Sequence, residues 1–253
     1  MKGWQIFMHS LRQVFNNLEG ALRVSAVLYV GQAVLGLLLL QTVSPWGESA
    51  NPDGMRTMMM AGDFPWASLI VVVLVAVICN LWIAVGWHRY VLTNEKPALL
   101  PALLGDRMWA YFLRGLMIGL ILIPVFIVVG LVVGFLAAAG GPPLAAIAAV
   151  ALAVPVWITG LRMSASLPGV ALGVETGIGQ AWNATKEDMG AFVALAVILA
   201  VLSFAVALVG TLAFQAIGLG LVWDFVFGWV QLMVGVSILT TLYGHYIEKR
   251  PLM

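Results

Sequence analysis

The sequence predicts an all-α fold, a polytopic membrane bundle of about six transmembrane helices preceded by an amphipathic interfacial helix. Three observations indicate this class: 62% of the 253 residues are hydrophobic, only 9% are charged, and the mean hydropathy is +1.05. An ordinary soluble domain carries about 25% charged residues. A water-soluble fold of this length could not bury so much apolar surface, so most of that surface is expected to face lipid.

Residues 1–20 form the first predicted element. Apolar side chains recur at helical spacing from Trp4 to Leu18, and polar side chains such as Gln5 and Arg12 occupy the other face. This pattern is typical of an amphipathic helix lying in the inner membrane interface, and it differs from a cleaved leader peptide. A cytoplasmic helix that packs on a partner is the alternative interpretation.

Six apolar runs make residues 21–253 the predicted transmembrane domain, since a helix crosses a bilayer in roughly 20 residues. The predicted spans are 24–43, 66–87, 115–139, 144–161, 190–214 and 225–243. Helices are expected because each backbone polar group is then bonded within its own segment.

The third and fourth predicted spans are expected to form an antiparallel hairpin. Only the short phrase "AAGGPP" (138–143) separates them. Pro124 and Pro155 fall near the middle of these two spans and are expected to break the helices there, which would create a hinge or a substrate-sized gap. A kink that serves only helix packing is the alternative interpretation.

Basic residues predict the orientation in the membrane. All of the 12 Lys and Arg residues except Arg56 lie at the termini or in connections expected on the same side as the termini. By the positive-inside rule, both termini are expected in the cytoplasm. The net charge of only +1 gives no reason to expect a nucleic-acid partner.

Aromatic, histidine and basic side chains gather where the chain is expected to leave the membrane inward. The phrase "VGWHRYVLTNEKP" (85–97) follows the second span, and "YGHYIEKRP" (243–251) follows the sixth. Each phrase can be an ordinary membrane anchor, because aromatic rings favour the headgroup zone and Arg or Lys favours the inner face. Alternatively, these side chains form one collar that binds anionic lipid headgroups or an acidic segment of a partner. The predicted collar comprises Trp87, His88, Arg89, Tyr90, Arg114, Arg162, His245 and Tyr246.

The connection after the fourth span, 169–189, is predicted to be re-entrant or to lie on the membrane surface. Pro168 should end or kink the outgoing helix, and the glycine-spaced segment after it can turn back. Trp182 is expected to anchor a short interfacial helix in this connection.

Three short phrases resemble a known group of proteins. They are "WHRYVL" (87–92), "RMSASLP" (162–168) and "AWNATK" (181–186). They resemble a widespread group of uncharacterised bacterial polytopic membrane proteins, which is similar to the membrane domain attached to some glycerophosphodiester phosphodiesterases. The resemblance implies an orphan bacterial membrane module. It carries over no catalytic residue, and the sequence contains no phosphodiesterase domain.

The sequence predicts neither catalysis nor a cofactor. It has no P-loop, dinucleotide fingerprint, nucleophile elbow or metalloprotease helix. His9, His88 and His245 lie on separate predicted elements without ligand spacing, so ordinary interfacial histidines are expected instead of a metal site. The phrase "MRTMMM" (55–60) could ligate copper(I), or it could form a hydrophobic turn resting on the membrane.

Two classes of function are compatible with these features. The first is a non-catalytic scaffold or accessory subunit of the bacterial inner membrane, whose cytoplasmic face binds lipid headgroups, another membrane protein or a second copy. The second is a small-solute or lipid transporter that uses the broken third and fourth helices. Ion-coupled transporters usually need charged groups within the membrane, and no Asp, Glu, Lys or Arg falls clearly within the middle of a span. The first class is therefore favoured.

Overall fold

A computed structural model describes residues 2–41, 60, 66–96 and 99–252. Within these ranges the regular structure is helical, and five helices are long and apolar enough to cross a membrane. The predicted all-α fold of membrane type is therefore confirmed. Arg56 and most of the methionine-rich phrase lie outside the described residues.

The described helices follow the order of the predicted spans. They are α1 (Lys2–Phe15), α2 (Leu18–Gln41), α4 (Trp66–Thr93), α5 (Gly105–Ser164), α6 (Leu167–Leu172), α7 (Ile178–Ala184), the 3-10 turn η1 (Lys186–Asp188), α8 (Met189–Val209), the π-helical turn η2 (Gly210–Gln215), α9 (Gly220–Leu242) and the π-helical turn η3 (Tyr243–Ile247). The second predicted span begins where α4 begins, but α4 continues through the "WHRYVL" phrase to Thr93.

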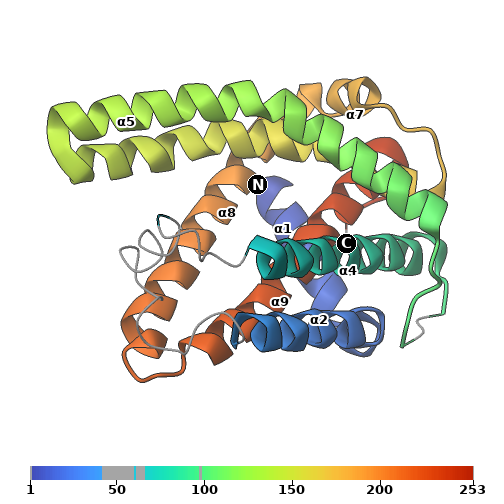
Figure 1. Ribbon diagram of the computed structural model, residues 1–253. Coiled ribbons are helices and arrows are strands. Elements are labelled where there is room, and N and C mark those ends of the chain that lie inside the picture. Colours follow the sequence, from blue (N-terminus) through green and yellow to red (C-terminus); the bar gives the residue numbers. More distant parts are fainter. Residues whose placement is uncertain (1, 42–59, 61–65, 97–98, 253) are drawn as a thin grey trace.

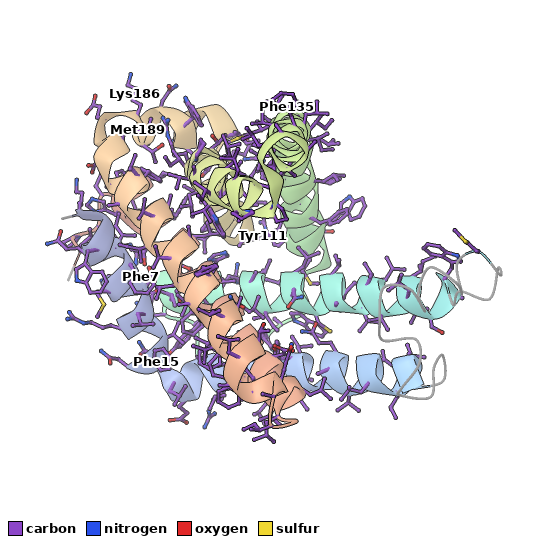
Figure 2. All side chains as sticks on the ribbon, turned by 90° about the vertical axis from the view of Figure 1, so that its left-hand side faces the viewer. Phe7, Phe15, Tyr111, Phe135, Lys186 and Met189 are labelled. Carbon is purple, nitrogen blue, oxygen red and sulfur yellow. The ribbon has the colours of Figure 1, made fainter. Side chains whose placement is uncertain are left out.

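Helix α5 folds back on itself and supplies both the third and the fourth predicted spans. As one straight helix its 60 residues would extend about 90 Å. The backbone instead leaves helical geometry at Gly141, whose φ of 77° suits glycine, and two prolines follow. The two arms lie side by side in Figure 1 and are seen almost end-on in Figure 2. The predicted hairpin is confirmed, with its turn inside the "AAGGPP" phrase.

The predicted breaks at Pro124 and Pro155 are wrong. Within α5 only Gly141 has non-helical dihedral angles, so both arms continue through their prolines. Membrane helices tolerate proline because local adjustments and neighbouring groups satisfy the freed backbone carbonyls. The transporter hypothesis therefore loses the broken helices on which it was based.

Helix α1 packs against both α8 and α9, beside the start of the first and the end of the second. Its contact face contains Gly3, Ile6, Ser10 and Val14, which recur every three or four residues and are buried. Figure 2 shows Phe7 and Phe15 along this helix beside α8, whose first residue is Met189. The predicted helix is present, and one of its faces is covered by the bundle.

The amphipathic sequence pattern predicted only some of the residues on this contact face. Trp4 and Phe15, placed on the apolar stripe by spacing, are exposed on the outside of α1. Gly3 makes the contact instead, because a Cβ atom there would lie only 2.4 Å from the carbonyl oxygen of Ala191. Ser10 adds a polar contact, with its Oγ 2.9 Å from Oγ1 of Thr241.

The connection between α5 and α8 turns twice. Pro168 lies in the first turn of α6, and Gly173 ends this helix with a φ of 82° in the left-handed region. The short helix α7 then carries Trp182, so the short helix predicted there is confirmed.

Candidate functional site

One end of the bundle collects the segments that were predicted to share a side. Here α1 contacts α8 and α9, α4 contacts α6, and α7 contacts η3. Two long-range polar contacts join them: Nζ of Lys2 lies 2.5 Å from Oδ2 of Asp188, and Nη2 of Arg250 donates to the carbonyl of Leu92 at 3.0 Å. We call this region the basic end.

Two members of the predicted collar, Trp87 and His88, are fully buried. The indole Nε1 of Trp87 donates to Oγ of Ser237 at 2.7 Å. Nδ1 of His88 lies 2.8 Å from Oγ1 of Thr240, and its Nε2 lies 3.1 Å from the hydroxyl of Tyr111. These contacts join α4 to α9 and α5. A headgroup at the surface would not touch either side chain.

Two arginines of the collar hold the connection that contains α7. Arg114 Nη1 donates to the carbonyl of Thr176. The buried Arg162 donates from Nε to Oγ1 of Thr185 at 3.0 Å and from Nη2 to the carbonyl of Trp182 at 2.9 Å. A cation suits this position, because the last carbonyls of α7 lack intrahelical partners and carry partial negative charge.

Tyr246 belongs to a third group of contacts. Its hydroxyl donates to Oδ2 of Asp188 at 2.9 Å, and the same oxygen accepts from Lys2. The Tyr246 ring packs on Phe192, with the ring centres 5.4 Å apart. Tyr246 therefore joins η3 to the starts of α1 and α8.

The other collar members lie nearer to solvent. The guanidinium of Arg89 is paired with the carboxylate of Glu95. Tyr90 and His245 line a cleft of about 760 Å³ between α1, the end of α4 and the chain after α9. We call it the basic cleft. Its charged and histidine side chains are His9, Arg12, Glu95, Lys96, His245 and Arg250.

The charges in the basic cleft are only partly compensated by neighbouring residues outside its lining. Arg250 Nε lies 2.6 Å from Oε2 of Glu248, and the acidic Glu95 is paired with Arg89. Among the described residues, Arg12 and Lys96 form no ion pair. Two cations from distant segments are therefore available to an anionic group in the cleft.

Most of the residues that line the basic cleft were not predicted from the sequence. The predicted collar took residues at helix exits, whereas Arg12 belongs to α1 and Lys96 follows the end of α4. The sequence signal shared by both residues was their expected location on the cytoplasmic side. Their meeting depends on the docking of α1, which no local pattern specifies.

The three histidines lie in different surroundings. His88 is buried, Nδ1 of His245 lies 3.0 Å from the carbonyl of Arg250, and His9 lines the basic cleft. In the part of the chain that the structure describes, no group of three or more His, Cys, Asp or Glu side chains is arranged to hold a metal ion.

Fold and cleft together define a class, a multi-pass helical membrane protein with a basic cleft at one end of its bundle. No protein-family model matches the chain, and neither a curated protein nor a solved structure matches it. The resemblance to the bacterial polytopic group stays a prediction.

Proposed function

We propose that this chain is a non-catalytic scaffold or accessory subunit of the bacterial inner membrane, with both termini in the cytoplasm. Its basic cleft binds an anionic group, supplied by a lipid headgroup or by an acidic segment of another membrane protein or a second copy. The observation that carries the proposal is the meeting of Arg12 and Lys96, both without an ion pair among the described residues, in one cleft.

The chemistry of the cleft suits a phosphate or carboxylate ligand. A guanidinium such as that of Arg12 can bind either group through two parallel hydrogen bonds, and Lys96 adds a point charge. Near an anionic membrane surface each basic side chain contributes about 1 kcal/mol of attraction. Tyr90 and His245 add polar ring groups to the lining. The volume of about 760 Å³ falls within the range of about 300–1,000 Å³ typical of small-molecule sites.

The experiment compares two double charge reversals. Arg12→Glu with Lys96→Glu changes the cleft, whereas Lys186→Glu with Lys249→Glu makes the same charge change on exposed residues outside its lining. Native mass spectrometry measures retention of phosphatidylglycerol against phosphatidylcholine. We expect the cleft variant to bind the anionic lipid about tenfold more weakly, equivalent to about 1.4 kcal/mol, and the control to bind as the unaltered protein does.

The same variants test the protein-partner form of the proposal. Proteins that co-purify under mild solubilisation are compared between the cleft variant and its control, after both are shown to insert in the membrane. Selective loss from the cleft variant supports binding of an acidic segment. Equal lipid and protein retention by both variants would reject the basic cleft as a binding site.

A further inference from the structure

A second cavity, of about 850 Å³, lies between the two arms of α5, α8, α9 and one side of α1. We call it the apolar groove. Apolar side chains such as Phe126, Trp157 and Val206 form its walls, while Ala153 and Gly235 leave room between them. Gly235 has open space where a Cβ atom would be. The polar part of the lining among the described residues is Ser164, Ser203 and Gln231.

The groove continues into a smaller pocket of about 400 Å³ near the connection from α8 to α9. The two cavities share the lining residues Ser203, Val206, Phe227 and Gln231. Thr211, Gln215 and Asp224 make the pocket polar. Of the described residues that line either cavity, Asp224 is the only charged one, and it forms no ion pair with the described part of the chain.

The wall of this polar pocket has a defined local structure. Gly210, Thr211 and Gln215 come from η2, and π-helical turns are rare and often found at functional sites. Trp223 packs tightly over Gly210, where a Cβ atom would lie 2.6 Å from the indole Nε1. The Trp223 ring also stacks on Phe227, with the ring centres 3.8 Å apart. The pocket is therefore shaped by packed aromatic rings and a widened helical turn.

The dimensions of the groove fit a lipid chain. Phe227 and Leu239 both line it, and at 1.5 Å per residue they are about 18 Å apart along α9. Half of a hydrocarbon core of about 30 Å is about 15 Å. The length of the groove is therefore comparable to the depth of one leaflet, and the groove is apolar along its length and acidic at one end.

We infer that one membrane phospholipid with a primary ammonium headgroup binds here, with an acyl chain in the apolar groove and the ammonium beside Asp224. Charge complementarity selects the headgroup, because Asp224 is an uncompensated carboxylate at the polar end. Gln215 offers an amide donor for the lipid phosphate. The headgroup end of this site, at Asp224, lies at the opposite end of α9 from Thr240 and Thr241 of the basic cleft, and the inference does not depend on the proposed function.

Two variants separate the chain-binding part from the headgroup-binding part. Gly235→Leu fills the groove from α9, and its control Gly134→Leu adds the same side chain at a glycine with open space outside the groove. Asp224→Asn removes the carboxylate charge, and Asp106→Asn does so at an exposed position far from the pocket along the chain. Ala153→Trp fills the groove from α5 if Gly235→Leu fails to fold.

Native mass spectrometry is carried out with phosphatidylethanolamine and phosphatidylglycerol of identical chains. We expect the unaltered protein to retain one phosphatidylethanolamine in preference, and Gly235→Leu to reduce retention of both lipids about tenfold. Asp224→Asn should still bind the lipid acyl chain but should lose the preference for phosphatidylethanolamine over phosphatidylglycerol. Equal retention of both lipids by the unaltered protein, or equal effects of the variants and their controls, would overturn the site and leave only ordinary surrounding lipid.

Discussion

The guanidinium carbon of Arg162 lies 3.7 Å from the centre of the Trp182 ring, and the same side chain donates to the Trp182 carbonyl. Arg162 is buried and has no ion pair among the described residues. Its charge is stabilised by the end of α7, a hydroxyl and an aromatic face. The arginine predicted to bind a headgroup therefore positions a short helix.

We expect Arg162→Met to lower the free energy of unfolding by about 2–4 kcal/mol, since a hydrogen bond from a charged group contributes about 1.5–3 kcal/mol. Chemical unfolding in a mild detergent measures this loss. Arg23→Met is the matched control, because Arg23 forms an exposed ion pair with Glu19 within α2. An exposed pair of this kind contributes about 0.3–0.5 kcal/mol to stability. Equal losses in the two variants would contradict a structural role for Arg162.

We expect Thr240→Val to destabilise the bundle by about 1–3 kcal/mol, because it leaves a ring nitrogen of the buried His88 without its hydrogen-bond partner. Thr240→Ser retains the hydroxyl and should restore most of the loss. Thr211→Val is the control, since the hydroxyl of the exposed Thr211 donates to the carbonyl of Ala207 in its own turn. Thermal unfolding of the three variants tests the expectation, and a Thr240→Ser protein as weak as Thr240→Val would contradict it.

We expect Gly3→Ala to loosen α1, because the new methyl group would overlap the carbonyl oxygen of Ala191. Overpacking of this kind costs about 1–3 kcal/mol. Amide hydrogen exchange over residues 2–15 should become faster. Gly190→Ala is the control, since a Cβ atom there would project into open space. Unchanged exchange in Gly3→Ala would show that α1 can shift without loss of packing.

The orientation in the membrane is tested with single cysteines in a Cys79→Ala background. We expect Glu95→Cys and Glu187→Cys, both at the basic end, to resist an impermeant reagent added outside intact cells. Ala216→Cys, in the connection between α8 and α9, should react with it. The reverse labelling pattern would reject cytoplasmic termini.

The hydropathy pattern predicted the helices, but it did not predict which helices pack against one another. The spans followed from apolar runs, because a chain in lipid must satisfy its backbone within each helix. The burial of Trp87 and His88 did not follow, since an aromatic and histidine phrase at a helix end looks the same whether it faces headgroups or another helix. Their partners Ser237 and Thr240 are about 150 residues away along the chain.

The basic cleft and the contact face of α1 also depend on helix packing that the sequence pattern did not predict. Charge counting placed Arg12 and Lys96 on one side, but only the docking of α1 brings both residues to one cavity. The contact face of α1 depends on Gly3, because the absence of a side chain lets the backbone of α1 approach that of α8. A hydropathy pattern gives such a residue little weight, so it emphasised Trp4, which is exposed.

The fold-back of α5 at Gly141 has a consequence for biogenesis. The two arms share one helical element and meet at a turn marked by a single residue with non-helical angles. A translocation machinery would therefore have almost no hydrophilic chain to thread through the membrane between these arms. We expect the two arms to move from the translocon into lipid together as a preformed hairpin. Packed against each other, they keep the polar backbone groups of the turn away from the hydrocarbon of the bilayer.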